Sequence, residues 1–355
     1  MVTMLDCIKR VPSLMDKIVE KADDNFRKIL ETLDGREIDE LCFIGSGTSF
    51  NGASTARYLA EKASGLRVSV ILPEEFLYQY TVRNPKALYV FISQTGTSTI
   101  TMKALRYVKE MGFLSLGVSE EPDTPVAREA DLFLDMGCGH EEYGMRTIGY
   151  STTVLSLMWL GIEIGHRRGN VSDEEYELYK KQEAAAARNI PDVIEKAMKW
   201  MDTSRRRMMK SQFFSFTGTG PLYGVAMEAS VKIWEAPQFP SGGYELDEGM
   251  HGPNYGYNYN HAVFVLNDGG FGNDRALALA RYMKNEHQNG YVIGKGAIDD
   301  KDLGFEPAGG SFMCLEYAAA IQVLMYRLAV DGGRDFSILG VHAKMNSYFQ
   351  SHTDK

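Results

Sequence analysis

The stretch Ala87-Leu-Tyr-Val-Phe-Ile-Ser-Gln-Thr-Gly-Thr-Ser-Thr99 joins an apolar strand to a loop of hydroxyl and amide side chains around one glycine. Apolar residues at helical spacing follow the loop and predict a helix. In a strand–loop–helix arrangement, the backbone N–H groups at the helix N-terminus point towards the loop and can bind an anion. The loop contains no lysine or arginine, so we predict that neutral donors there hold a small phosphorylated metabolite. The side-chain donors are Ser93, Thr95, Ser98 and Thr99.

The composition is that of a globular chain with room for two domains. It has 355 residues, of which 44% are hydrophobic and 24% charged, enough for a substantial core. The formal net charge is −9 and the one dense basic run lies at residues 205–210, which disfavours nucleic acid as a partner. The N-terminus lacks a basic and apolar leader, and the apolar segment 153–164 is too short to span a bilayer. We therefore expect no membrane association.

The four cysteines point to a reducing compartment. They lie far apart in the sequence and form no CxxC pair, which is typical of reduced thiols in a cytoplasmic protein. We interpret them as core or neutral residues.

The chain contains one unit written twice. At an offset of 173 residues, segment 41–48 superposes on segment 214–221, so Gly45 and Gly47 fall on Gly218 and Gly220. In both copies a short apolar strand enters a G-x-G turn and leaves into a helix, predicted over residues 51–63 and 224–236, as in parallel α/β sheets. Further strands are expected at residues 67–72, 88–92, 114–118 and 131–134 in the first copy. The second copy offers strands at 213–217, 262–266 and 290–293 and a last helix at 314–330.

The expected fold is α/β, with two tandem domains that each contain a doubly wound, five-stranded parallel sheet flanked by helices. Between the copies, Ser172 and Glu175 have the spacing of a capping box, and the residues from 175 to 201 look helical apart from Pro191. We expect N-terminal helices and the first domain within residues 1–170. A helical connector would follow at 171–205, and the second domain, with a C-terminal tail, at 206–355.

The two G-x-G turns do not extend to nucleotide-binding motifs. Phe50 and Tyr223 stand where a dinucleotide fingerprint has its third glycine, and neither turn holds G-K-[ST], so dinucleotide and NTP sites are disfavoured. A lone G-x-G is most often a packing turn, but the duplication and the hydroxyl-rich loop favour a ligand site here.

Two loops of the first copy resemble those of the SIS (sugar isomerase) domain family. The segments are Ile44-Gly-Ser-Gly-Thr-Ser-Phe-Asn51 and Ser93-Gln-Thr-Gly-Thr-Ser98, and the duplicated arrangement resembles the isomerase half of glucosamine-6-phosphate synthase over roughly residues 25–350. The resemblance implies that residues of the second loop hold a sugar phosphate and that residues of the first line the sugar. The implied phosphate contacts are Ser93, Gln94, Thr95 and Ser98, and the implied sugar contacts are Gly47, Thr48 and Ser49. A looser match over residues 142–147 adds Thr147.

In the second copy, Glu228, Lys232 and Glu235 are spaced to share one face of a helix. Such charges usually form an exposed, salt-bridged helix face. Glu235, however, directly precedes Ala236-Pro237, at the predicted helix C-terminus, where the macrodipole disfavours a carboxylate and makes it a better general base.

The resemblance gives these residues roles in aldose–ketose chemistry. Gly249-Met-His-Gly-Pro253 matches the K-H-G-P segment of the synthase, which implies that His251 opens the sugar ring. The Ala-Lys pair at 343–344 matches the synthase's terminal Ala-Lys, which implies that Lys344 meets the open-chain carbonyl. Glu235 would then move the proton between C1 and C2, with Lys232 and Glu228 orienting it. The resemblance also implies a homodimer in which the histidine crosses the interface.

Several reactions fit this set of residues. The chain starts Met1-Val-Thr, not with the synthase's catalytic cysteine, so we expect no use of glutamine. An isomerase or deaminase acting on an amino-sugar or ketosamine 6-phosphate is expected first. The alternatives are a fructosamine 6-phosphate deglycase, a ketose/aldose phosphate isomerase and a non-catalytic regulator that senses sugar phosphates.

Neither a cofactor nor a metal is expected. The seven histidines show no ligand-spaced pairing with one another. The nearest candidate, His140 beside Glu141 and Glu142, is interpreted as a solvated polar loop.

Overall fold

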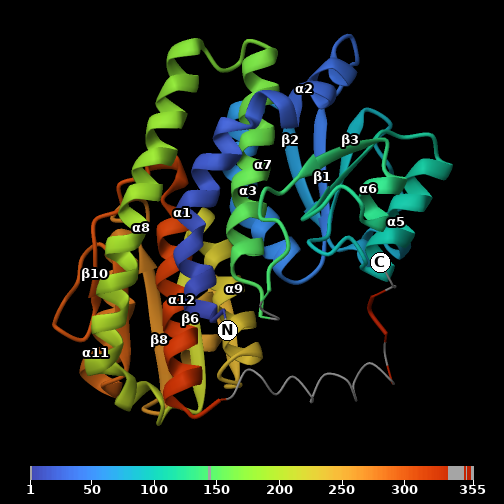
Figure 1. Cartoon of the computed structure of the whole chain (residues 1–355). Coiled ribbons are helices and arrows are strands. Elements are labelled where there is room, and N and C mark those ends of the chain that lie inside the picture. Colours follow the sequence, from blue (N-terminus) through green and yellow to red (C-terminus); the bar gives the residue numbers. More distant parts are fainter. Residues whose placement is uncertain (1, 143–144, 335–347, 349, 353–355) are drawn as a thin grey trace. The chain divides into compact units, whose positions relative to one another are not determined.

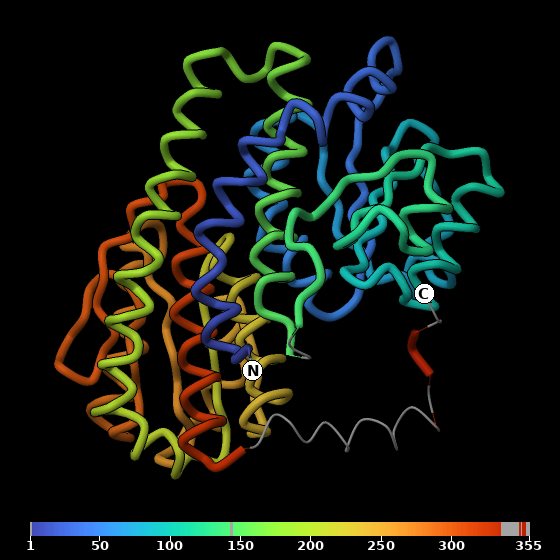
Figure 2. The backbone as a smooth tube through the Cα atoms, viewed as in Figure 1, coloured from blue at the N-terminus to red at the C-terminus, as the bar shows by residue number. Residues whose placement is uncertain are grey.

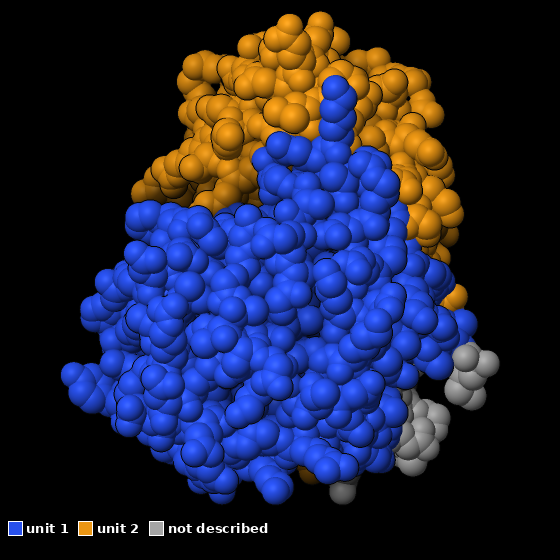
Figure 3. All heavy atoms as spheres, turned by 90° about the vertical axis from the view of Figure 1, so that its left-hand side faces the viewer, with its two compact units in different colours: residues 1–12, 181–335 blue, residues 13–180, 336–355 orange. Residues whose placement is uncertain are grey.

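The computed structural model describes residues 2–142, 145–334, 348 and 350–352 (Figure 1). The chain divides into two compact units (Figure 3). Unit 1 comprises residues 1–12 and 181–335, and unit 2 comprises residues 13–180 and 336–355. Unit 2 therefore contains the first copy of the repeated motif, and unit 1 contains the second.

Unit 2 is built on a five-stranded parallel sheet in the order β2-β1-β3-β4-β5. The strands are β1 (Glu40–Gly45), β2 (Arg67–Ile71), β3 (Ala87–Ile92), β4 (Ser115–Ser119) and β5 (Leu132–Asp135). Every residue of β1 and β3 is buried. Strands covered on both faces are continuous apolar runs, which is why these strands could be predicted within a residue or two of their bounds.

The helices of unit 2 are α2 (Ala22–Leu33), α3 (Thr48–Ser64), α4 (Pro73–Tyr78), α5 (Thr99–Glu110), α6 (Pro125–Glu129) and α7 (Ile148–Arg167). Helices α3 and α7 run parallel and very close. Gly52 lies against Thr153, Gly161 against Ala60, and Gly165 against Ala63, and a Cβ at Gly161 would lie 2.4 Å from the Cα of Ala60. Because α3 starts where β1 ends, the N-terminus of α7 lies at that same edge of the sheet.

Unit 1 repeats this topology. Its sheet has the order β10-β9-β8-β6-β7, so β6 corresponds to β1 and β8 to β3. The strands are β6 (Phe213–Gly218), β7 (Ser241–Glu245), β8 (His261–Asn267), β9 (Gly290–Gly294) and β10 (Leu303–Gly304). The helices are α9 (Pro221–Glu235), α10 (Pro253–Gly256), α11 (Asn273–His287) and α12 (Cys314–Asp331), with short 3₁₀ turns η1 (Glu248–Met250) and η2 (Gly310–Phe312). Both sheets thus have the predicted five parallel strands.

One segment of unit 1 meets the length and composition of a membrane span. Gly310–Asp331 has a mean hydropathy of 1.3, and 83% of it is buried inside the protein. Helix α12 packs against α9 and β9, so its apolar surface is accounted for by the core of unit 1. The four cysteines are free and buried, as predicted for core thiols.

Two helices carry the chain past the unit boundaries, α1 (Met4–Glu20) and α8 (Asp173–Met208) (Figure 2). The predicted capping box is present at the start of α8. Ser172 N donates to Glu175 Oε2 over 2.9 Å, and Glu175 N donates to Ser172 Oγ over 3.2 Å. Pro191 lies inside α8 without ending it, so the helix continues through the expected break.

The repeated G-x-G turns have nearly the same backbone conformation. Gly47 has φ 56° and ψ −127°, and Gly220 has φ 53° and ψ −127°. The first glycine of each turn is packed tightly, since a Cβ at Gly45 would lie 2.9 Å from Ser49 Cβ and one at Gly218 would lie 2.8 Å from Leu222 Cβ. The duplication inferred from the sequence is therefore also a duplication of local geometry.

Candidate functional site

A polar cavity of about 990 Å³ opens at the carboxyl edge of the sheet in unit 2. Most of its lining comes from the turn after β1, the loop from β3 into α5, and the first turns of α7, and Glu74, Arg146 and residues 350–352 complete it. Seven of the eight residues expected to bind substrate are in the lining, namely Gly47, Thr48, Ser49, Ser93, Gln94, Thr95 and Ser98.

The strand order explains why the cavity lies there. Strands β1 and β3 are neighbours, but the chain leaves β1 towards β2 on one side and leaves β3 towards β4 on the other. Loops that diverge at such a switch point leave a crevice at the carboxyl ends of the strands, where open α/β sheets bind ligands.

The loop from β3 into α5 is held in a defined turn. Gly96 has φ +66°, its N–H donates to Ser93 O over 2.9 Å, and a Cβ there would lie 2.2 Å from Thr124 Cβ. Thr101 Oγ1 donates to Ser98 Oγ over 3.0 Å. The amides in the first turn of α5 have no acceptor earlier in the helix, so the helix end carries partial positive charge.

Several side chains in the lining were not among the predicted contacts, and three of them are ionisable: Glu74, Arg146 and His352. Arg146 is half-buried in the lining, and its guanidinium donates to Glu141 O over 2.8 Å. His352 also lines the cavity, with its Nδ1 3.2 Å from Thr97 Oγ1. The 93–98 loop carries only neutral side-chain donors, whereas the rest of the lining adds one cation, Arg146, and one carboxylate, Glu74. Arg146 is the one cation in segment 142–147, and that was the available sequence signal.

The end of the chain contacts the same loop. Ser351 O accepts hydrogen bonds from the N–H of Thr99 over 3.1 Å and from its hydroxyl over 3.2 Å. Gln350 and Ser351 also line the cavity. No sequence pattern indicated this contact, which joins residues some 250 positions apart.

The eighth predicted residue, Thr147, is fully buried and lies outside the lining. Its N–H and hydroxyl donate to Glu141 Oε1 over 2.8 and 2.9 Å. The interpretation of segment 140–142 as a solvated loop was wrong for Glu141, whose exposed fraction is 2%, because five donors replace water around its carboxylate. His140 is exposed and lies 3.6 Å from a carboxylate oxygen of Glu120. Within the described part of the chain, no cluster of three or more potential metal ligands is found.

The charged residues of α9 form a largely buried trio in unit 1. Lys232 Nζ lies 2.6 Å from Glu235 Oε2 and 3.6 Å from Glu228 Oε1. The side chains of Lys232 and Glu228 are 3% and 5% exposed, whereas that of Glu235 is 36% exposed. The trio is therefore not the exposed, salt-bridged face that such charges usually form, and the neighbouring Trp234 is exposed instead. The shared helix face and the place of Glu235 as the last residue of α9 are confirmed.

His251 follows the 3₁₀ turn η1 and is exposed. Its Nδ1 lies 2.8 Å from Asp247 O. A carbonyl oxygen can only accept, so Nδ1 carries the hydrogen and Nε2 is the basic nitrogen of the neutral ring. Asp247 itself forms an ion pair with Arg275. Lys344 lies outside the described residues.

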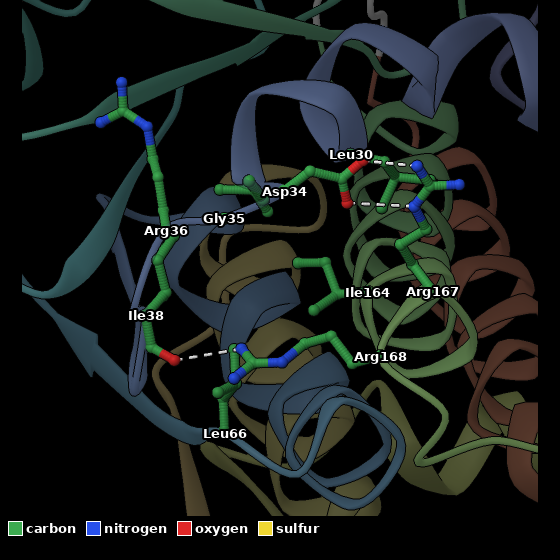
Figure 4. Close-up of a pocket in the computed structure, with 10 residues that line it drawn as sticks. Leu30, Asp34, Gly35, Arg36, Ile38, Leu66, Ile164, Arg167 and Arg168 are labelled. Atoms are coloured by element: carbon green, nitrogen blue, oxygen red, sulfur yellow. Dashed lines mark hydrogen bonds and ion pairs between the residues drawn. The ribbon is translucent and has the colours of Figure 1, made fainter.

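A second cavity in unit 2, of about 200 Å³, lies at the opposite edge of the sheet (Figure 4). Its floor is apolar, and its arginines are engaged within the protein. Arg167 forms a paired contact with Asp34, and Arg168 donates to Ile38 O over 3.0 Å. Figure 4 shows Arg36 directed away from both. This cavity lies at the amino ends of β1 and β2, away from the crevice where such sheets bind ligands.

One family model and several known proteins are similar to this chain. Residues 36–162 match the SIS domain model. Glutamine--fructose-6-phosphate aminotransferase [isomerizing] from Haemophilus influenzae is 26% identical over 334 residues, which cover 90% of this chain and 52% of that protein. The chain thus spans about half the length of this relative.

Solved structures agree over nearly the whole chain. A Clostridium difficile protein assigned as a phosphosugar isomerase has a TM-score of 0.89 at 24% identity and covers 97% of this chain and 98% of its own. A Salmonella typhimurium protein assigned as sugar binding has a TM-score of 0.82 at 26% identity, and the match covers 91% of this chain and 98% of that protein. Glucosamine-6-phosphate deaminase from Thermotoga maritima has a TM-score of 0.71 at 21% identity, and the match covers 91% of this chain and 97% of that protein. Residues 36–162 therefore form a SIS domain, and a second domain of the same topology follows it in the chain.

Proposed function

We propose that the chain is a phosphosugar isomerase or deaminase acting on an amino-sugar or ketosamine 6-phosphate. The observation that supports this most is the polar cavity of unit 2, in which the hydroxyl-rich loop, the N-terminus of α5 and Arg146 converge. These are donors suited to a phosphate group. Similarity to an isomerizing aminotransferase and to a glucosamine-6-phosphate deaminase supports the same substrate class.

Two acid–base groups of the reaction, Glu235 and His251, come from unit 1. His251 transfers the proton that opens the sugar ring, using its basic Nε2. Glu235 then moves the carbon-bound proton between C1 and C2, and Lys344 pairs with the carbonyl or forms an imine to it. Lys232 holds the Glu235 carboxylate by the 2.6 Å contact, and Glu228 balances the charge of the buried ammonium group.

Catalysis is favoured over sensing by what it costs to bury charge. A regulator needs the cavity of unit 2, but it does not need a buried lysine between two carboxylates, one of them open to solvent. Burying an ion pair seldom adds net stability, so a functional role explains the trio better. A fructosamine 6-phosphate deglycase and a ketose/aldose isomerase remain the alternative reactions, since both use the same groups.

One substrate panel separates the reactions. The protein is incubated with fructoselysine 6-phosphate, glucosamine 6-phosphate and fructose 6-phosphate, and free amine, ammonia and aldose are assayed. We expect ammonia from glucosamine 6-phosphate. Amine release from fructoselysine 6-phosphate alone would identify a deglycase, and tight binding of all three without turnover would identify a sensor.

The role of Glu235 is tested by Glu235→Gln. This isosteric change removes the base, so turnover should fall by about 100-fold or more while sugar-phosphate affinity stays within about twofold. Glu286→Gln, an exposed carboxylate on α11, is the matched control and should behave as wild type. Wild-type turnover of Glu235→Gln would remove the assignment.

A homodimer with shared sites and a cytoplasmic location complete the proposal. The free, buried thiols are compatible with a reducing compartment. The proposed proton transfers need no redox or metal cofactor.

A further inference from the structure

Three helix N-termini meet at the carboxyl edge of the sheet in unit 2. Helix α3 begins after β1, α5 begins after the hydroxyl-rich loop, and α7 lies parallel to α3. Each N-terminus carries unsatisfied N–H groups and partial positive charge unless a side chain or another acceptor caps it. Residues of all three helices line the cavity, so each could attract an anion.

The N-terminus of α7 is closed by the buried carboxylate of Glu141. Oε1 accepts from the N–H of Thr147, the hydroxyl of Thr147 and the N–H of Ile148 at 2.8, 2.9 and 3.1 Å. Oε2 accepts from the N–H of Gly149 at 3.2 Å and from Nε2 of Gln94 at 3.2 Å. The carboxylate therefore satisfies the first amides of α7 and has one further bond, to the phosphate loop.

That last bond fixes the amide of Gln94. A carboxylate can only accept, so the NH₂ end of Gln94 must face Glu141, and one N–H remains for a ligand. The backbone of Gln94 is also held, because its carbonyl accepts from Glu120 N over 2.8 Å. The side chain packs directly on the start of α7, where a Cβ at Gly149 would lie 1.8 Å from Gln94 Oε1.

We propose that Glu141 is a positioning residue for the sugar-phosphate site, acting through Gln94. It rests on the proposed function, because it concerns the same cavity. Glu141 sets which end of the Gln94 amide the ligand meets and withdraws the N-terminus of α7 from anion binding, which leaves the ends of α3 and α5 for the phosphate. Its own carbonyl accepts from Arg146, which ties the second polar side chain of the cavity wall to the same residue.

Helix capping alone does not account for this arrangement. A local Ser, Thr or Asp beside the first turn would satisfy one or two amides of α7 at less desolvation cost than a fully buried glutamate. Capping also requires neither a glutamine from another loop nor a glycine at position 149 to make room for it. These features concern the orientation of Gln94.

The test measures binding of glucosamine 6-phosphate by calorimetric titration of the full chain in a double-mutant cycle. In Glu141→Gln, the amide oxygen stays on the three donors of Thr147 and Ile148. The new NH₂ group then faces the NH₂ of Gln94, so the amide of Gln94 loses its fixed orientation. We expect affinity to fall about tenfold in Glu141→Gln but less than about twofold when the same change is made in Gln94→Ala. Glu142→Gln, an exposed neighbour, is the matched control.

Gly149→Ala reaches the same interaction without touching the carboxylate. The added methyl group displaces Gln94, so affinity should fall about as much as in Glu141→Gln, and again not in the Gln94→Ala background. This variant keeps the test decisive if Glu141→Gln does not fold.

The outcomes separate the two proposals. If wild type binds glucosamine 6-phosphate and both variants bind it equally well, the positioning role is overturned. An equal loss with and without Gln94 would also overturn it, since Glu141 would then not act through that residue. If wild type binds none of the three sugar phosphates of the panel, the proposed function itself fails.

Discussion

Glu235 and Lys232 show how individual residues of unit 1 combine burial with access. The lysine is withdrawn from solvent while its carboxylate partner is about one third exposed, so a charged base faces solvent from a rigid support. A lone ammonium buried without partners would be costly. The residue types alone would also fit an exposed, salt-bridged helix face. The burial of Lys232 beside a partly exposed Glu235 is what favours the proposed acid–base role.

The exposure of these side chains could not be predicted from the sequence. The spacing of Glu228, Lys232 and Glu235 correctly predicted a shared helix face, but a helical pattern does not say which face meets the sheet. Arg146 was missed for a related reason. Its guanidinium donates to the carbonyl oxygen of the buried Glu141 at the cavity wall, and a glutamate in a polar stretch has no pattern that marks it as buried.

A buried carboxyl away from the site gives a pH prediction. Desolvation raises the pKa of Glu163 above 4.5, against the lowering effect of its hydrogen bond from Tyr176. The folded state therefore holds this proton more tightly than the unfolded state. The stabilisation from that proton is fully present below about pH 4.3, the unfolded value, and is lost as the pH rises through the raised pKa.

Glu163→Gln removes this titration and keeps an acceptor for Tyr176. Urea unfolding at several pH values from 4 to 8 should show the variant gaining stability relative to wild type as the pH rises through the raised pKa of Glu163, by roughly 1 kcal/mol or more. Glu174→Gln, exposed on α8, is the control and should follow wild type. A constant difference between Glu163→Gln and wild type across the range would refute the assignment.

The strand–turn–helix element recurs twice with the same backbone and different chemistry. The turn at Gly47 leads into Thr48 and Ser49 at the cavity, whereas the turn at Gly220 leads into Pro221 and α9. Neither glycine would meet an obstructing atom if it had a Cβ. The requirement is therefore for their backbone angles, which only glycine adopts without strain.

Because the two turns share one backbone conformation, alanine at either glycine should cost similar stability, but only the turn in unit 2 should affect ligand binding. Gly47→Ala and Gly220→Ala should each lower the free energy of unfolding by about 1–3 kcal/mol, measured by chemical denaturation. Calorimetric titration should then show weaker sugar-phosphate binding for Gly47→Ala only. Equal losses of affinity in both variants would mean that the cavity of unit 2 is not the binding site.

The strands show what sequence patterns resolve at the level of elements. β3 and β8 were predicted because buried parallel strands are unbroken apolar runs. β7 was missed because its sequence, Ser-Gly-Gly-Tyr-Glu, is not an apolar run. Its glycines allow α9 to pack close to the strand, since a Cβ at Gly243 would lie 2.4 Å from Ala226 O on that helix. β10 has only two residues, too few for any period.

The loops that follow the equivalent strands β3 and β8 differ in their chemistry. In unit 2 the strand β3 leads into hydroxyl groups, whereas its counterpart β8 leads into Asp268-Gly-Gly-Phe271. There the amides of Gly269 and Gly270 are taken by the side chains of Asn267 and Asp268. That loop is anionic and its donors are occupied, so it is unsuited to phosphate. The proposed function accordingly assigns phosphate binding to unit 2 and the roles of Glu235 and His251 to unit 1.

Subunit mixing tests the proposed dimer with shared sites. Glu235→Gln and His251→Ala should each be inactive. Random reassociation of the two should restore about a quarter of wild-type activity, because half of the dimers then contain one intact site. Mixing Glu235→Gln with Glu228→Gln, both on α9, should restore nothing. No recovery in the first mixture would argue against a histidine supplied across an interface.

The central claim, that the cavity at the carboxyl edge of unit 2 holds the phosphate of a sugar, is tested most directly by a crystal structure with glucosamine 6-phosphate bound. The account predicts phosphate oxygens within hydrogen-bonding distance of Ser93, Ser98 and the first amides of α5. A phosphate bound elsewhere, with this cavity holding only solvent, would contradict it.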